Sequence, residues 1–430
     1  MSSCYFGSAR ALGWVVSCCV IVGCSKKRGP EPPVEATKPE VHAPAAVEVH
    51  VAPLEVLSPD AREAAKLRVE HFQCNRCHTI EGIEPVPVEE SCVDCHAQIM
   101  AGTYEDKPEL LAKWRENIVH LKVTPSLVGV DKRFSREWLI GFLQRPHDLR
   151  PRVAAQMPRM PISERDAELI ADYLIPGKYA EQTLPEGASA ERGAELVASK
   201  GCGTCHAMTG ATLPASPIPV EVSPEAMALG MKLAPDLRHT RERFRPLALV
   251  AWLEDPVSLK PDSMMPKIPL TRAEAIDVAA YLLEAELAEP EPVAIPERLP
   301  ILERRVSYAE VEAKVFKKVC WHCHSDPAFN KGDGGPGNTG GLGFEGRGLD
   351  LSSYSSVASG MRDAQGKRMS VFKKTEDGTP WIVAAMHARY AEVAGKPVEG
   401  ITGMPLGLSP MTLEEIQLVE SWIAQGRPRR

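Results

Sequence analysis

The chain lacks any cysteine that could form a disulfide in the body of the protein. Of its twelve cysteines, four lie at or before position 24 and the other eight belong to four Cys-x-x-Cys-His motifs, which excludes a disulfide-stapled scaffold. Downstream of position 24 there is also no apolar run long enough for a transmembrane helix. A serine nucleophile elbow, a phosphate-binding loop and a suitably placed carboxylate pair are missing as well, which disfavours the common hydrolase and nucleotide-dependent enzyme classes.

The four motifs carry the main chemical signal. Their cysteines are Cys74, Cys77, Cys92, Cys95, Cys202, Cys205, Cys320 and Cys323, and their histidines are His78, His96, His206 and His324. This spacing is the attachment signature of c-type haem, in which two thiols bind one porphyrin and the adjacent imidazole binds its iron. The first two pairs are also spaced like a zinc ribbon, but a four-thiolate zinc site would not need the histidines. The sequence therefore predicts four covalent haem c groups.

The N-terminus predicts export and a lipid anchor. Residues 11–23 form a short apolar run after Arg10, too short to span a bilayer as a mature helix and typical of a signal peptide. The run ends in Ile-Val-Gly before Cys24, which resembles the lipobox of bacterial lipoproteins. The resemblance implies that residues 1–23 are removed, that Cys24 carries the lipid, and, since Ser25 follows, that the outer membrane is the destination. An ordinary signal peptide cut nearby is the alternative.

A tether should separate this anchor from the folded body. Residues 24–60 are rich in Pro, Glu, Ala and Val without a helical period, so we expect an extended segment. The formal net charge of the chain is −7, and loss of Arg10 with the leader would make it −8. An acidic body held at a periplasm-facing membrane surface favours a redox protein with a basic surface as partner and disfavours nucleic acid.

The body contains internal repeats. The segment from Pro125 to Pro146 is echoed by Pro235 to Pro256, and each copy contains one tryptophan, Trp138 or Trp252. Both copies run into a Met-Pro pair, and a third, more divergent Met-Pro pair lies near the C-terminus; the methionines are Met157, Met265 and Met404. Self-similarity of this kind indicates duplicated units.

Each unit is framed by two expected helices. After each Met-Pro pair comes a Ser or Thr with an acidic residue three positions later and an aromatic residue ten positions later, which predicts a capped closing helix. The caps are Ser163, Thr271 and Thr412, and the aromatic residues are Tyr173, Tyr281 and Trp422. Opening helices are expected at residues 61–73, 189–201 and 308–319, each leading into a Cys-x-x-Cys-His motif.

This order of helix, motif, loop, Met-Pro pair and closing helix resembles class I cytochrome c. The resemblance implies an all-α fold with cytochrome c domains at residues 61–178, 187–288 and 303–428, joined by Pro-rich linkers at 176–188 and 286–303. It also implies the axial iron pairs His78 with Met157, His206 with Met265 and His324 with Met404. The competing ligands are Met160 and Met264 for the first two methionines, and Met386, His387 and Met411 for the third.

The second motif, Cys92–His96, departs from this order because it lies inside the loop of the first domain, where it indicates an extra haem. Its distal ligand must come from elsewhere. We expect His120, on a helix that includes Trp114, and then His71 or His147; an open sixth position or a merely structural His120 are the alternatives. His239 and His322 are not expected to bind iron.

These features predict an electron carrier rather than an enzyme. Three His/Met haems of high potential and one bis-His haem of lower potential would exchange electrons while keeping both axial ligands. One alternative is a multihaem enzyme, a peroxidase or a reductase of a small oxyanion, with an open site at the extra haem. Another is a cytochrome subunit that docks an oxidase or a quinol-oxidising complex.

Overall fold

The computed structural model describes residues 57–118, 123–153, 157–325, 348–363 and 365–430. All of them belong to one compact unit, Val49–Arg430. The fold is mostly helical, with 45% helix and 3% strand, so the predicted all-α class is confirmed. A single two-stranded antiparallel sheet in the described part pairs β1 (Met361–Arg362) with β2 (Arg368–Met369). Among the described helices, none has the length and apolarity needed to cross a membrane.

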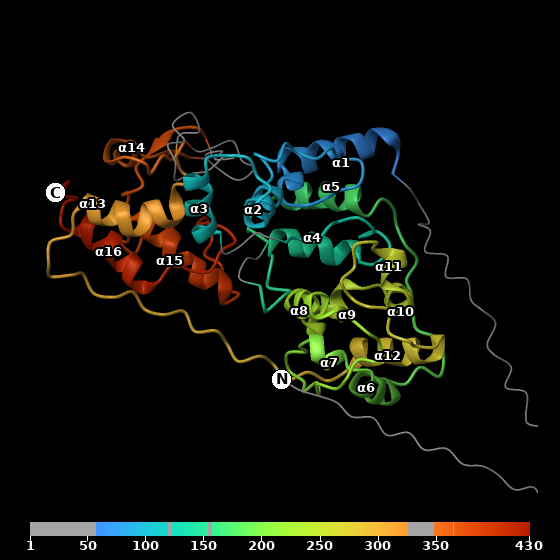
Figure 1. Cartoon of the computed structure of the whole chain (residues 1–430). Helices are drawn as coiled ribbons and strands as arrows, with labels where there is room; N and C mark the ends of the chain where they lie inside the picture. The colour runs from blue at the N-terminus through green and yellow to red at the C-terminus, as the bar shows by residue number, and fades with distance from the viewer. Residues whose placement is uncertain (1–56, 119–122, 154–156, 326–347, 364) are drawn as a thin grey trace, which may run out of the picture. The chain divides into compact units, whose positions relative to one another are not determined.

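The first segment, residues 57–175, is built on a pair of helices from its two ends. Its elements are α1 (Pro59–His71), the 3-10 helix η1 (Cys74–Arg76), α2 (Cys92–Ala101), α3 (Pro108–Asn117), α4 (Arg136–Gln144) and α5 (Glu164–Leu174). Helix α1 runs beside α5, which also contacts α4 (Figure 1). Ala65 and Val69 of α1 are fully buried in one core with Ala167 and Ile170 of α5. Helices α2 and α3 share a separate small apolar cluster of Cys95, Ile99, Trp114 and Ile118.

The second segment, residues 187–288, repeats this arrangement. Its elements are α6 (Ala190–Ser199), α7 (Cys202–Cys205), α8 (Pro224–Leu233), η2 (Leu237–His239), α9 (Thr240–Arg243), α10 (Pro246–Glu254), α11 (Pro256–Leu259) and α12 (Arg272–Glu284). Helix α6 crosses α12 (Figure 1) so closely that a Cβ atom on Gly193 would lie 2.0 Å from the carbonyl oxygen of Asp277. Only glycine permits such close backbone contact.

The third segment, residues 303–430, has the same two end helices and a longer region between them. Its elements are α13 (Tyr308–Val311), which continues as the π-helix η3 (Glu312–Cys320), then α14 (Tyr354–Ser359), the small sheet, α15 (Trp381–Val393) and α16 (Leu413–Ala424). Val311, Val315 and Phe316 are buried against Ile416 and Trp422 of α16. Position 311 precedes its motif by nine residues, as do Ala65 and Gly193, so equivalent positions face the closing helix in all three segments.

The predicted closing helices begin where their caps were expected. The side chains of Ser163, Thr271 and Thr412 accept hydrogen bonds from the backbone amides three residues later. In α12 and α16 a glutamate also accepts from the cap backbone, which completes a capping box. Opening helices also precede the first, third and fourth motifs, as predicted.

One expected helix ends earlier than the sequence suggested. Helix α3 was predicted to continue from Trp114 to His120, but it ends at Asn117 with Ile118 as its C-cap. Ile118 is buried in the small α2–α3 cluster and has non-helical dihedral angles, φ −81° and ψ 89°. Burial of this side chain therefore accompanies the end of the helix, and His120 lies outside the described residues.

The first two segments join through equivalent residues of the two sequence repeats. Phe134 and Phe244 form an antiparallel bridge, with ring centroids 5.0 Å apart. The amide of Ser135 donates to the carbonyl of Arg243 at 2.7 Å, and the amide of Arg245 donates to the carbonyl of Arg133 at 3.1 Å. In each hydrogen bond the donor and the acceptor come from corresponding positions of the opposite repeat, so this contact has local two-fold symmetry.

Candidate haem-binding sites

The eight motif cysteines are all unpaired thiols in the structure. The first, third and fourth motifs each follow an opening helix, whereas the second begins α2 itself, with Ser91 as its N-cap. Despite this difference, all four motifs offer the same groups, because each carries two thiols and an imidazole within about one turn. The unpaired state leaves both thiols of each motif available for thioether bonds to a porphyrin.

The proximal histidines of the first and second segments are oriented by the backbone. The Nδ1 atom of His78 lies 2.8 Å from the carbonyl oxygen of Pro125, and that of His206 lies 2.8 Å from the carbonyl oxygen of Pro235. A histidine that donates from Nδ1 presents the lone pair of Nε2 to a metal. Burial lowers the pKa of both imidazoles, and the proline carbonyls partly oppose this effect. Both side chains are therefore held neutral, as metal ligands must be.

The third segment has a related backbone contact at its motif histidine, although the buried Nδ1 atom of His324 has no hydrogen-bond partner among the described residues. The amide of Leu351 donates to the carbonyl of His324 at 2.7 Å, and the Leu349 backbone partly offsets the lowering of the pKa of His324 by burial. In the first two segments the amides of Leu127 and Leu237 donate one residue further on, to the carbonyls of Thr79 and Ala207. A sequence signal for this contact exists, because Leu349-Asp-Leu is similar to Pro235-Asp-Leu. The similarity is hard to recognise because leucine replaces proline at the first position.

A tight side-chain turn fixes each of these supports. The side chains of Ser126, Asp236 and Asp350 accept from the amide two residues later, at 3.2, 2.9 and 2.8 Å. Asp236 is buried and also accepts from the Thr209 amide at 3.0 Å. Burial acts to raise the pKa of Asp236, but hydrogen bonds from Thr209 and Arg238 outweigh it and hold the pKa below its usual value. Such turns rigidify the chain that carries the acceptor carbonyl.

The candidate axial methionines lie in similar surroundings. Met157 and Met265 are half-buried against the cores of the first and second segments. Met404 is half-buried too, and its amide donates to the carbonyl of Ala385 at 2.8 Å.

The competing residues differ from these methionines in exposure or in their partners. Met160, Met386 and Met411 are buried in the apolar cores, and Met264 is 39% exposed. The Nε2 atom of His387 lies 2.8 Å from the carbonyl of Pro296 in the linker. A thioether at the edge of a cofactor pocket should be half-buried. The three Met-Pro methionines meet this expectation better than fully buried or exposed methionines do.

The histidines considered as the distal ligand of the second motif lie in different surroundings. His71 ends α1 and packs edge-on against Phe72. His147 packs against His239, with ring centroids 4.5 Å apart. Across from His96 the structure places the ring of His322, with centroids 6.0 Å apart.

The thiols of three motifs lie close to one another. A side-chain hydrogen bond links Cys77 of the first motif to Cys92 of the second; this contact raises the pKa of Cys77 and, together with the nearby Arg76, lowers the pKa of Cys92 to about 7. Cys323 of the fourth motif has its pKa raised to about 12 by burial and by the charge of Cys92. The cysteines that would attach three of the haems therefore lie close together.

A group of buried arginines supplies a second test of whether haem fits. Arg133 and Arg243 are 5% and 7% exposed, and within the described residues neither forms an ion pair. The pKa of each is lowered to about 10, by burial and, for Arg243, also by the charges of the neighbouring Arg133 and Arg150. Arg150 also lowers the pKa of His78. Both guanidinium groups donate to backbone carbonyls and lie over the ring of Phe134, so their polar atoms are satisfied. Their positive charge has no anionic partner in the described part of the chain, and haem propionates are carboxylates that would supply one.

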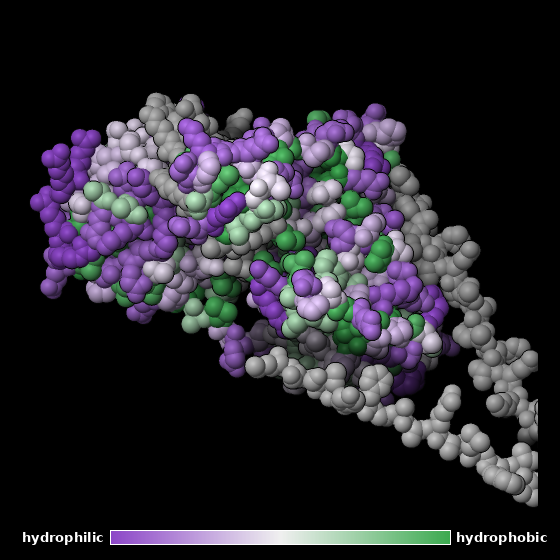
Figure 2. Space-filling view, viewed as in Figure 1, coloured by the Kyte–Doolittle hydropathy of each residue, from purple (hydrophilic) through white to green (hydrophobic). Residues whose placement is uncertain are grey.

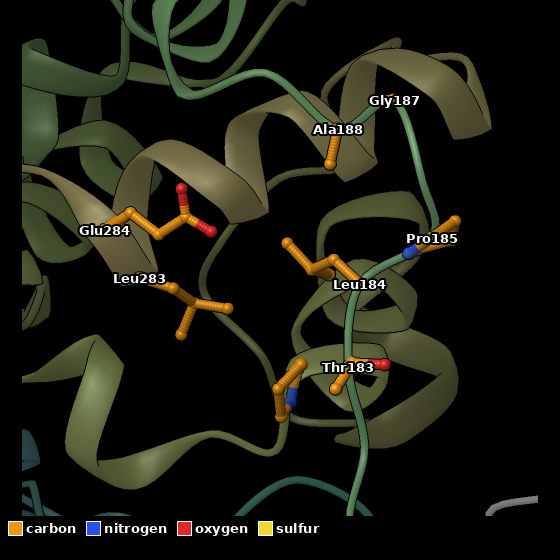
Figure 3. A pocket seen from close by; sticks show the side chains of 8 residues that line it. Thr183, Leu184, Pro185, Gly187, Ala188, Leu283 and Glu284 are labelled. Carbon is orange, nitrogen blue, oxygen red and sulfur yellow. The ribbon is translucent and has the colours of Figure 1, made fainter.

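A pocket in the second segment does not belong to this chemistry (Figure 3). It has a volume of about 410 Å³ and is lined by Thr183, Leu184, Pro185, Gly187, Ala188, Pro246, Leu283 and Glu284. Its lining includes no cysteine, histidine or methionine, so we assign it no redox role.

Crossing end helices, thiol pairs and backbone-oriented imidazoles together define a haem-binding cytochrome fold. Residues 190–286 match the family model described as Cytochrome c. This part of the chain is therefore a cytochrome c domain, which carries covalent haem c with its iron and takes part in electron transfer. No curated protein and no solved structure gave a significant match to the chain.

Proposed function

We propose that the protein is a tetrahaem c-type cytochrome that relays electrons between redox partners of a bacterial cell envelope. The observation that carries this proposal is the repeated support beneath His78 and His206, because a proline carbonyl faces the Nδ1 atom in both segments although the family match covers only the second. We assign covalent haem to all four cysteine pairs, and axial pairs of His78 with Met157, His206 with Met265 and His324 with Met404. His96 is assigned as the proximal ligand of the remaining haem.

Bound haem would supply the one-electron chemistry, and the chain's residues prepare its surroundings. His78 and His206 are pre-oriented by their proline carbonyls, so no reorganisation is needed when the charge on a bound metal changes. Arg133 and Arg243 supply buried positive charge, which favours the reduced state of a nearby centre. Met157 and Met265 pack against apolar cores that would limit the access of water, which favours a high potential.

The contact of Cys77 with Cys92 supports a relay over independent carriers. Electron tunnelling falls off steeply with distance, and adjacent attachment edges keep that distance short. The enzyme hypothesis requires an open iron site at the second motif, whereas His322 lies across from His96 there.

We also propose that Cys24 carries a lipid anchor and that the protein faces the periplasm from the outer membrane. The tether expected at residues 24–60 would end before Ser58, because Pro59 and Asp60 belong to α1. The formal charge of −7 suits a basic partner surface. On the face seen in Figure 2, hydrophilic and apolar residues are interleaved, and exposed large apolar side chains such as Leu67 and Val257 are scattered along the sequence. This pattern suits transient docking better than a permanent apolar interface.

The test begins with haem counting in the purified full-length protein. Pyridine haemochrome analysis should give four haems per chain, and stopped-flow mixing should show all four reduced by a dye mediator and reoxidised by ferricyanide. Hydrogen peroxide and nitrite, offered to the reduced protein, should not be turned over. Fewer than four haems, or catalytic turnover of either substrate, would overturn the relay. Separately, Cys24→Ser should move the protein from the membrane fraction to the soluble fraction; retention at the membrane would refute the anchor.

A further inference from the structure

We infer that His322, a residue inside the fourth Cys-x-x-Cys-His motif, is the distal iron ligand of the haem carried by the second motif. The inference rests on the proposed function, because it presumes a haem at Cys92 and Cys95. It assigns a role to a side chain that the motif pattern leaves unassigned, since the two residues between the cysteines need no particular identity.

The first argument is the separation of the rings. The centroids of His96 and His322 are 6.0 Å apart, and their planes are inclined by 37°. Metal–nitrogen bonds to imidazole are about 2.0–2.1 Å long, so two imidazoles on opposite sides of one metal have centroids roughly 6–6.5 Å apart. The directly packed pair His147 and His239 is closer, at 4.5 Å. The spacing of His96 and His322 falls within the range expected for two imidazoles on one metal.

The second argument is the orientation of the fourth motif. His324 is buried beside the Leu349 backbone, which suits a ligand of the motif's own haem. Trp321 is held against the backbone of the third segment, because its indole nitrogen donates to the carbonyl of Leu351 at 2.9 Å. Trp321 and His324 thus contact the Leu349–Leu351 backbone of their own segment. His322, which lies between them in the sequence, contacts His96 of the first segment instead.

The third argument is the burial of His96. His96 itself is only 7% exposed. A buried proximal imidazole with a second imidazole opposite forms a closed site, which does not suit binding of an external substrate.

The assignment has a consequence for the relay. His322 is bonded through one peptide unit to Cys323, which carries a thioether to the fourth motif's haem in the proposed holoprotein. The distal ligand of one haem and the covalent attachment of the next are therefore neighbours in the sequence. His322 would provide a through-bond route between them.

The experiment uses the full-length holoprotein and counts the haems that bind carbon monoxide after full reduction, together with the spin state of the oxidised protein by electron paramagnetic resonance. In the wild type we expect no carbon monoxide binding, and near-infrared magnetic circular dichroism should show one bis-imidazole haem among three His/Met haems. His322→Ala should convert one haem in four to a high-spin form that binds carbon monoxide. Added imidazole should restore the low-spin form, and His322→Met should keep six-coordination while raising one midpoint potential.

Three matched variants act as controls. Thr204→Ala changes the same motif position in the second segment, His147→Ala removes a histidine paired with His239, and His120→Ala removes the ligand expected from the sequence. All three should keep every haem six-coordinate. The inference is overturned if His322→Ala leaves all haems low-spin, if His120→Ala opens the site instead, or if the wild type already binds carbon monoxide at one haem. If His322→Ala loses haem or fails to fold, loss of the bis-imidazole signal in His322→Met decides, and its persistence there refutes the assignment.

This outcome is separate from the test of the proposed function. Four haems without peroxide or nitrite turnover, combined with an unchanged His322→Ala spectrum, would leave the relay standing and remove only the assignment of His322. A haem count below four in the wild type would instead remove the tetrahaem function.

Discussion

The crossing of α6 and α12 allows a sharp prediction for Gly193→Ala. A Cβ atom at this position would lie 2.0 Å from the carbonyl oxygen of Asp277 and 2.8 Å from the Cβ of Tyr281. These neighbours are backbone or backbone-proximal atoms that cannot rotate away, so the two helices must separate. Overpacking of this kind typically costs about 1–3 kcal/mol, and the better helix propensity of alanine returns about 0.5–1 kcal/mol.

The net expectation is a loss of about 1–2 kcal/mol for the second segment. At roughly 4–8 °C per kcal/mol for a domain of 60–100 residues, its unfolding midpoint should fall by about 5–15 °C. The assay is thermal unfolding of the oxidised holoprotein, followed by the Soret band and by the absorption band of methionine-bound ferric haem.

Gly141→Ala is the matched control. Gly141 also lies in the middle of a helix, α4, but nothing lies within 4 Å of a Cβ atom built there. This variant should be stabilised by about 0.5–1 kcal/mol, because only the propensity effect remains. If Gly193→Ala is as stable as Gly141→Ala, the close helix crossing is wrong.

Further predictions concern the ligands and charges around the sites. Met265→His should lower one midpoint potential in a spectroelectrochemical titration, since imidazole favours ferric iron more than a thioether does; an unchanged set of potentials would exclude Met265 as a ligand. Arg243→Gln should lower a potential by on the order of 50 mV through loss of buried positive charge, while Arg165→Gln, whose side chain is 71% exposed, should change none. Asp236→Ala should cost about 1–3 kcal/mol of unfolding free energy and the equivalent Ser126→Ala less, as measured by guanidinium unfolding. Because the pKa of Asp236 is depressed in the folded state, its contribution is full above pH ~4 and is lost as the pH falls through the folded pKa; the Asp236→Ala difference should shrink there.

Local features of the fold were predictable because their causes lie within a few residues. A cap at Ser163 or Thr271 acts on amides three positions away, and the helices that follow begin where those caps stand. The opening helices were equally accessible, since apolar periodicity and the following motif are both local signals. The support beneath His78 was visible only in part, because the repeat showed Pro125 and Pro235 as equivalent without showing that their carbonyls face the histidines.

Features that depend on distant segments could not be predicted. The end of α3 at Asn117 coincides with burial of Ile118 in a cluster shared with α2, and that cluster has no sequence signature. The buried pair Arg133 and Arg243 appears in the sequence as ordinary surface charge. His322 is not expected from the sequence to bind iron, and its neighbour in space, His96, is 226 positions away in the chain.

The way the segments connect differs along the chain, and the repeats explain why. Phe134 and Phe244 stand nine residues after Pro125 and Pro235, so two copies of one surface can pair with each other. Nine residues after Leu349, the equivalent position holds Ala358, which offers no aromatic ring for this contact. The third segment therefore cannot use the same interface, and its contact with the first segment involves the haem motifs themselves. A metal bond through His322 would give that connection the specificity that the Phe134–Phe244 contact gives the other.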